Sequence, residues 1–180
     1  NGPDWTSTIA IIPWNIYLFY GDSRILEENY ENIKRYVDYI DENYPSGITD
    51  WGLGDWVPVN SVAPKEFTSS AYFYVDAKIL SKAAGILGNT ADAKKYAVLA
   101  EKIKTAINRK YLDRQTGMYG SGLQTELSVA LHRGLVPDDL VPKVAENLAE
   151  RVIADNKHID AGWLGTKAIL NALSEYGYAD

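Results

Sequence analysis

Hydrophobic residues recur every three or four positions along most of this chain, which is the spacing that places them on one face of an α-helix. The clearest stripe runs from Leu26 to Tyr44, and others run through residues 72–86, 96–107 and 140–152. Shorter helices are predicted at residues 8–20, 124–133 and 164–176. No segment alternates hydrophobic and polar residues with a period of two, so the pattern predicts an all-α fold.

Residues that commonly cap helices lie at the ends of these stripes. Asp22 is the predicted N-cap of the helix that contains Leu26, with Glu27 and Glu28 in or near its first turn. Asn89 or Thr90 is predicted to begin the helix through residues 96–107. His132, near the end of its helix, is interpreted as a favourable partner of the helix dipole.

Glycines mark the short turns between helices. Four of them are predicted to end helices in a left-handed conformation: Gly21, Gly88, Gly134 and Gly177. Pro142 is acceptable in a helix because it falls in the first turn after Asp138 or Asp139.

Short turns alternate with three long connections, at residues 43–66, 113–123 and 155–163. Helices joined in this way form consecutive antiparallel hairpins, so all the long connections should gather at one end of the domain. A straight bundle, an open solenoid and an arc of a closed α/α toroid all fit this order, although the uneven spacing of the glycine turns argues against a regular repeat array. Function is expected at the long-loop end, because binding residues concentrate on loops held by a rigid scaffold.

Composition narrows the functional classes. The 180 residues are the size of one domain, and 18 Lys plus Arg against 24 Asp plus Glu give a net charge of −6. Neither nucleic acid nor an anionic membrane surface is favoured as a partner by that charge. The longest apolar stretch, Ile9 to Trp14, is far shorter than the ~20 residues of a membrane span.

The cysteine and histidine content limits the cofactors that the chain could bind. The chain has no cysteine and only two histidines, which excludes disulfides and thiolate chemistry and disfavours a histidine-rich metal site, so we expect no cofactor. The chain opens on Asn-Gly-Pro rather than Met, which suggests a segment of something longer; its compartment is undetermined, and a periplasmic or secreted parent is compatible with the sequence.

Tryptophan and aspartate are paired in the first long loop. Asp50-Trp51 and Asp55-Trp56 are separated by a glycine-rich turn, and Asp4-Trp5 repeats the pair near the start of the chain. A sugar ring needs an aromatic platform for its C–H face and acceptors for its hydroxyl groups, and these pairs offer both. The alternative is a loop that its tryptophans pin to the core.

The other two long loops carry similar chemistry. The second leads into Gln124-Thr125-Glu126, where Glu126 could recognise hydroxyl groups or could only oppose a helix dipole. The third contains His158, Asp160 and Trp163, and His158 is predicted to face a ligand although a lone histidine is more often structural.

Catalysis by acyl or phosphoryl transfer loses support, because no Gly-x-Ser-x-Gly, Walker or dinucleotide-type glycine motif occurs. Paired carboxylates are the remaining catalytic chemistry, with Asp50, Asp55, Glu126 and Asp160 as candidates. An inverting glycosidase would hold two carboxyl groups ~6.5–9.5 Å apart and a retaining one ~5–5.5 Å.

The chain resembles the catalytic α/α barrel of bacterial α-L-rhamnosidases, glycoside hydrolase family 78. The matching residues run in order through nearly the whole chain: Pro13-Trp14, Tyr17, Tyr20 to Asp22, Ile25 to Tyr30, Gly54-Asp55-Trp56, Thr68 to Tyr72, Gln124 to Glu126, Ala130-Leu131, Gly134 to Pro137, His158, Gly162 and Leu164 to Thr166. The resemblance implies a six-hairpin toroid, inversion by two glutamates, and a pocket for terminal L-rhamnose without a catalytic metal.

Two features of that family do not occur here. Its general acid lies in an acidic segment before a Gly-Trp-Thr-Gly-Asp-like motif upstream of the matched stretch, and its general base lies in a Trp-Glu motif downstream. Seven predicted helices are also too few to close a twelve-helix toroid. The chain is therefore expected to be the central part of such a barrel, an incomplete segment covering residues 1–180, without the acid and base.

The residues expected to line the sugar pocket are Asp4, Trp5, Asp50, Trp51, Asp55, Trp56, Glu126, His158 and Trp163. The expected partner is a carbohydrate that contains L-rhamnose, and the oligomeric state is undetermined. Two alternatives stay open: a helical scaffold whose aromatic residues grip a protein, and an α/α-toroid enzyme for another sugar.

Overall fold

The computed structural model describes residues 2–179 and consists of helices joined by loops, with one very short β-hairpin. Within these residues the elements are α1 (Pro3–Thr6), α2 (Thr8–Tyr20), α3 (Arg24–Asn43), α4 (Lys65–Ile86), α5 (Thr90–Tyr111), β1 (Leu112–Asp113), β2 (Met118–Tyr119), α6 (Gln124–Arg133), the 3₁₀ turn η1 (Asp138–Leu140), α7 (Val141–Ala154) and α8 (Trp163–Glu175). The all-α prediction is confirmed.

Two small elements were missed by the sequence pattern. β1 and β2 pair antiparallel over two residues each, which is too short for any period to show. The four-residue α1 is likewise shorter than the window in which a helical stripe can be recognised. The hairpin and α1 are additions to the predicted helices and leave the all-α class unchanged.

The predicted caps are confirmed at most helix ends. Asn89 Oδ1 accepts a hydrogen bond from the backbone N–H of Asp92 at 3.3 Å and so begins α5. The prediction for Asp22 is wrong by one position, because Ser23 is the N-cap of α3 and Asp22 instead accepts from the N–H of Arg24. The four predicted C-terminal glycines, at positions 21, 88, 134 and 177, all have positive φ angles between 70° and 84°.

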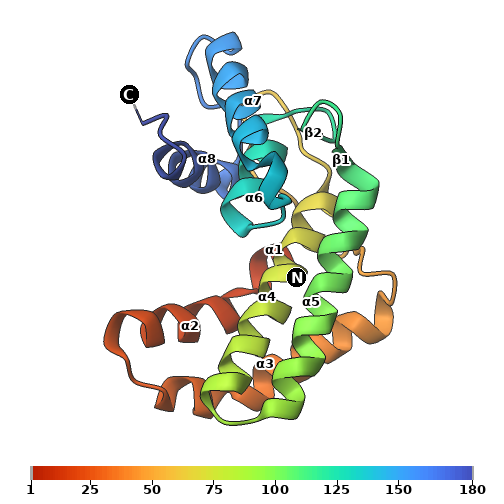
Figure 1. Cartoon of the computed structure of the whole chain (residues 1–180), viewed down its shortest axis with the longest axis vertical. Helices are drawn as coiled ribbons and strands as arrows, with labels where there is room; N and C mark the ends of the chain where they lie inside the picture. The colour runs from red at the N-terminus through yellow and green to blue at the C-terminus, as the bar shows by residue number, and fades with distance from the viewer. Residues whose placement is uncertain (1, 180) are drawn as a thin grey trace.

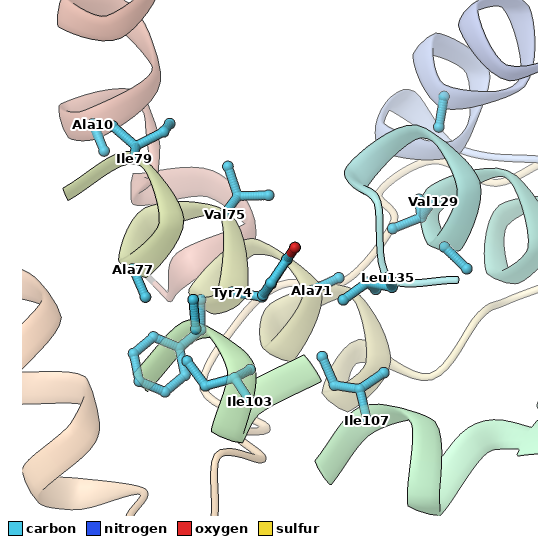
Figure 2. Packing of buried hydrophobic residues seen from close by; sticks show 14 of the residues in the cluster. Ala10, Ala71, Tyr74, Val75, Ala77, Ile79, Ile103, Ile107, Val129 and Leu135 are labelled. Carbon is cyan, nitrogen blue, oxygen red and sulfur yellow. The ribbon is translucent and has the colours of Figure 1, made fainter. Parts of the chain in front are cut away.

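Helix α4 is the centre of the molecule. It runs beside α5 in Figure 1, with α2 and α3 at one end of the pair and α6, α7 and α8 at the other. Figure 2 shows its labelled residues lying between Ala10 of α2, Ile103 and Ile107 of α5, and Leu135, which follows α6. Burial of an aliphatic side chain in such a core stabilises the fold by about 1.5–3 kcal/mol.

Outside this core, ion pairs join α3 to α5. Lys34 pairs with Asp92, Lys95 with Asp38, and Lys102 with Asp41, all between 2.7 and 2.8 Å. Lys34 and Asp92 are partly buried and the other two pairs are more exposed. Surface pairs of this kind each contribute about 0–1 kcal/mol, so they orient the two helices more than they stabilise them.

The long loops meet at one end, as predicted. They precede α4, α6 and α8, so the N-terminal ends of these three helices face the same region. Hydrogen bonds join the first loop to the third and the third to the start of α6, as described below. Among the described residues, none of the helices is both long and apolar enough to span a lipid bilayer.

Candidate functional site

Asp55 is the hydrogen-bonding centre of the region where the long loops meet, which we call the loop face and define as residues 49–61, 120–126 and 155–165 together with α1. The residue is buried, with 4% of its surface exposed. Oδ1 accepts from the backbone N–H groups of Leu164 (2.8 Å) and Gly165 (3.1 Å). Oδ2 accepts from the N–H of Gly162 (2.8 Å) and the hydroxyl of Thr125 (2.6 Å). Four donors fill the lone-pair positions of a carboxylate.

Glycine is required on both sides of this carboxylate. A Cβ atom at Gly162 would lie 2.6 Å from the carbonyl oxygen of Asp55 and 2.7 Å from its Oδ1. At Gly165 it would lie 2.7 Å from Cβ of Ala161 and 2.8 Å from Oδ2 of Asp55. The two glycines therefore let the start of α8 approach the first loop closely enough for its N–H groups to reach Asp55.

A second buried carboxylate ties the same two loops together. Asp160 Oδ1 accepts from the N–H groups of Asn60 (2.7 Å) and Ser61 (3.1 Å), and Oδ2 accepts from the Ser61 hydroxyl at 2.5 Å. These bonds, with the Ser61 hydroxyl first, lower the pKa of Asp160. Gln124 completes the connection, because its side-chain amide donates to the carbonyl of His158 and accepts from the N–H of Asp160.

Asp4 fastens the N-terminal helix to the first loop. It is buried and accepts from the N–H of Gly54 at 2.7 Å, from the N–H of Leu53 at 3.3 Å and from the Ser69 hydroxyl at 3.1 Å. Burial raises the pKa of Asp4, and the hydrogen bonds, first that from Gly54, oppose the rise. The carboxylates of Asp4, Asp55 and Asp160 therefore accept their hydrogen bonds from other groups of the protein.

Three indole rings remain accessible around these carboxylates. Trp56 is 57% exposed and Trp163 is 70% exposed. The backbone N–H of Trp163 donates to the backbone carbonyl of Trp56 at 3.0 Å. Trp5 packs edge-on against Trp56 with ring centroids 5.7 Å apart, and its indole N–H donates to the carbonyl of Gly54. The hydrogen-bonded loops therefore expose aromatic rings to solvent.

Backbone strain occurs beside this surface. Val57, next to Trp56, has φ of 56°, a left-handed conformation that a β-branched residue rarely adopts. The hydrogen bonds made by its neighbours hold it there. Val57 and Trp163, with Gly162, Thr166, Lys167 and Leu170 among others, line a hollow of about 490 Å³ along one face of α8, which is large enough for a monosaccharide by comparison with typical ligand pockets of ~300–1,000 Å³.

Trp51 and Asp50 differ from the other predicted residues. The Trp51 ring packs against Tyr36 and Tyr39 of α3, with centroids 6.4 and 5.5 Å apart, as expected for a loop pinned by its tryptophan. Asp50 is exposed. His158 is also exposed, and its carbonyl rather than its ring is bonded to Gln124.

Glu126 is completely buried in the first turn of α6. Its Oε2 accepts from the N–H groups of Ser121 (2.9 Å) and Leu123 (3.0 Å), which satisfies donors that the start of a helix leaves free. Burial raises its pKa, and Oε1 has no hydrogen-bond partner. This geometry matches the helix-capping interpretation of Glu126.

The interpretation of His132 as a charged dipole partner is wrong. Burial lowers its pKa to about 4, helped by the positive charges of Arg133 and Lys167. The ring is therefore neutral at pH 7 and supplies no charge to the end of α6. Among residues 2–179, no group of three or more His, Cys, Asp or Glu side chains is arranged to hold a metal ion.

Several residues that hold the loop face together were not predicted. Asn60 and Ser61 hold Asp160, and Ser69 holds Asp4. Nothing in their local sequence distinguishes them from other loop or helix residues. Only the fold, which brings together positions 65 to 100 residues apart, gives them a partner.

Comparison with known proteins gives a consistent result. The family described as the bacterial alpha-L-rhamnosidase 6 hairpin glycosidase domain matches residues 1–180. An alpha-L-rhamnosidase of Streptomyces avermitilis is 30% identical over 179 residues, and one of Alteromonas sp. is 28% identical over 188 residues. Each match covers 98% of this chain but only 17% and 20% of the respective relative, so the chain spans about a fifth of their length.

Solved structures agree. The alpha-L-rhamnosidase of Dictyoglumus thermophilum has a TM-score of 0.89 and 38% identity, covering 99% of this chain and 21% of that one. The Streptomyces avermitilis alpha-L-rhamnosidase, solved in complex with L-rhamnose, has a TM-score of 0.88 and 29% identity, covering 94% of this chain and 16% of that one.

Proposed function

Because this chain belongs to the bacterial alpha-L-rhamnosidase six-hairpin glycosidase family, we propose that it is the central segment of an inverting α-L-rhamnosidase barrel and forms part of its pocket for terminal L-rhamnose. Its consecutive hairpins are part of an α/α toroid. The observation that carries the proposal is the loop face, where Asp55 draws together the first loop, the start of α6 and the start of α8.

The division of labour within the loop face follows from its geometry. The rings of Trp5, Trp56 and Trp163 offer flat faces that suit the C–H surface of a sugar. Asp4, Asp55 and Asp160 accept hydrogen bonds from the protein and act as positioning residues that hold those rings in place. Asp50 and His158 are exposed and remain the polar candidates for contact with the hydroxyl groups of the sugar.

The general acid and base are proposed to come from outside residues 1–180. The buried carboxylates of Asp4, Asp55 and Asp160 are occupied by three or four donors each, and Glu126 caps a helix. The three aspartates have their oxygens occupied, and Glu126, whose Oε1 has no partner, is completely buried away from any substrate or solvent. This segment therefore contributes to binding of the sugar, and residues of flanking segments transfer the protons.

An activity assay tests the assignment of acid and base. The 180-residue chain and a form extended in both directions are incubated with an aryl α-L-rhamnoside, and release of the aryl group is followed. We expect turnover only with the extended form. Equal turnover by the short chain would overturn the placement of the acid and base, whereas an extended protein that is folded but inactive would overturn the substrate.

A binding experiment tests the aromatic surface. Replacing Trp56 with alanine in the extended form should weaken L-rhamnose binding at least tenfold, because stacking on an exposed ring is lost. Phe19→Ala is the matched control: Phe19 is also exposed, but it lies at the end of α2, away from the loop face. Equal affinities of the two variants for L-rhamnose, measured by calorimetry, would contradict the proposal, and tighter binding of another sugar would redirect it.

A further inference from the structure

Asp76 lies in the middle of α4, and its side chain is completely buried. Its Oδ2 atom is 2.6 Å from Oγ of Ser7, the residue that joins α1 to α2. The same hydroxyl oxygen is 2.6 Å from the carbonyl oxygen of Pro3, the first residue of α1. Three oxygen atoms therefore form a short chain from the core of α4 to the N-terminal helix.

These two contacts limit where the protons lie. Oxygen atoms about 2.5–3.0 Å apart share a hydrogen bond, which needs one proton between them. The hydroxyl of Ser7 has one proton and the carbonyl of Pro3 has none. If Asp76 were ionised, one of the two oxygen pairs would face each other without a proton. A proton on Asp76 satisfies both contacts, because the acid donates to Ser7 and Ser7 donates to Pro3.

The surroundings of Asp76 favour the neutral acid. None of the ion pairs among the described residues includes Asp76. Its Oδ1 atom has no hydrogen-bond partner, which costs less for the carbonyl oxygen of an acid than for a carboxylate. Burial raises the pKa of Asp76 well above its ordinary value, while Ser7 and the positive charge of Arg133 oppose the rise.

The neighbouring positive charge, that of Arg133, forms no ion pair with Asp76 among the described residues. Arg133, at the end of α6, donates to the hydroxyl of Tyr72 at 2.7 Å and lies over that ring. Tyr36 of α3 and Asp4 of α1 are also titratable groups of this region; burial raises the pKa of Tyr36, so its hydroxyl stays neutral and supplies no positive charge. An ionised Asp76 would thus be a second buried anion near Asp4.

We propose that Asp76 is a neutral carboxylic acid in the folded protein and a positioning residue that holds α1 against α4 by donating a hydrogen bond to Ser7. Helix α1 carries Asp4, which fastens the first loop, and Trp5, which packs against Trp56. The proton on Asp76 thereby supports the aromatic surface of the loop face. That last step rests on the proposed function, whereas the protonation state does not.

Carbon-13 NMR of the 180-residue chain tests the protonation state directly. The carboxyl carbon of Asp76 is assigned by the signal that disappears in Asp76→Asn. We expect it to keep the chemical shift of a neutral acid from about pH 5 to 8, where an ordinary aspartate with a pKa of about 3.9 is ionised. A carboxylate shift at neutral pH would overturn the proposal.

Two substitutions test the donor. Asparagine can donate to Ser7 from its amide, so Asp76→Asn should keep the ratio of folded to unfolded protein within about threefold at about pH 4, where the unfolded native chain is still largely protonated at Asp76, whereas Asp76→Ala should lower it by about tenfold or more. Equal losses would overturn the proposal. Ser7→Ala, which removes the link without touching α4, should resemble Asp76→Ala in direction.

The pH dependence separates the proposal from a merely structural effect of packing. A group protonated in the folded state and ionised in the unfolded state loses stability as the pH rises between its two pKa values, by up to tenfold in the folded-to-unfolded ratio per pH unit. Asp76→Asn lacks that group, so its advantage over the native chain should grow as the pH rises from about 4. A difference that does not change with pH would contradict the proposal.

L-Rhamnose binding to the extended form links Asp76 to the loop face. Asp76→Asn should bind as the native protein does, and Asp76→Ala should bind at least threefold more weakly. Equal affinity of Asp76→Ala would overturn the positioning claim. If the native protein does not bind L-rhamnose, the proposed function fails, while the NMR signal and the pH dependence still decide the state of Asp76.

Discussion

Water has almost no access to the side chain of Asp55, and four donors form hydrogen bonds with its two oxygens. Asparagine at this position would turn an amide group towards either the N–H of Gly162 or those of Leu164 and Gly165, and donors would face donors. We expect Asp55→Asn to lower the free energy of unfolding by about 2–4 kcal/mol, measured by urea denaturation.

Asp50→Asn is the matched control for Asp55→Asn, five residues away in the same loop. Its side chain is exposed, so the free energy of unfolding should change by less than about 0.5 kcal/mol. If both variants unfold at the same urea concentration, the Asp55 carboxylate does not hold the loops together.

His132 makes the fold sensitive to acid. Its pKa of about 4 lies below the ordinary value of 6.5, so between these values the unfolded chain binds more protons than the folded one. Stability from the neutral ring is therefore complete above pH 6.5 and is lost as the pH falls towards 4. His132→Gln should reduce the loss of unfolding free energy between pH 7 and 4.5 by about 1–2 kcal/mol, after allowance for partial exposure to solvent.

His158→Gln, in the exposed third loop, is the control for that measurement. It should keep the acid sensitivity of the native chain. An unchanged slope of stability against pH in His132→Gln would show that another group causes the acid loss.

The local sequence indicated the chemistry of the loop face better than the roles of its residues. An aspartate beside a tryptophan in a glycine-rich loop fits a sugar acceptor and a loop anchor equally well. The donors that occupy Asp55 come from positions 70 to 110 residues away, and a local pattern cannot contain them. Asp55 is buried and its neighbour in the sequence, Trp56, is exposed, and this difference in exposure is determined by the fold.

At the scale of the helix, replacing either of two glycines near the end of α4 with alanine should change the stability of the protein, in opposite directions. Gly85 is helical, and a Cβ atom there would meet nothing within 4 Å, so Gly85→Ala should stabilise the protein by about 0.5–1 kcal/mol. Gly88 has a φ of 77° and equally open surroundings, so Gly88→Ala should destabilise it by about 1 kcal/mol. Thermal unfolding of the pair isolates backbone conformation from packing, and shifts of the same sign would refute this explanation.

Helices were predictable where one face is buried. Helix α3 has a buried stripe and polar residues elsewhere, and its extent was predicted within two residues at the start and one at the end. Helix α4 is buried on most sides, so the hydrophobic stripe through residues 72–86 marked only its C-terminal part. Its first turns carry Thr68, Ser69 and Ser70, whose burial depends on the loop packed over them, and its true start at Lys65 was hidden.

At the scale of the whole molecule, helix α2 exposes several hydrophobic side chains to solvent. Ile12, Leu18, Phe19 and Tyr20 of α2 are all more than half exposed. Apolar surface of this kind favours association, so the isolated 180-residue chain should sediment faster as its concentration rises. Phe19→Glu should suppress this dependence without changing the far-ultraviolet circular dichroism. A sedimentation coefficient independent of concentration would show that the exposed α2 residues are too sparse to associate.

The bonds of Asp55 also set an order of events during synthesis. Its most distant partner, the N–H of Gly165, is 110 residues further along the chain. At a translation rate of ~5–20 residues per second, the ribosome makes that partner about 5–20 s after Asp55. A nascent polypeptide must keep this side chain hydrated during that interval, so the hydrogen bonds of Asp55 are completed only after the start of α8 has been translated.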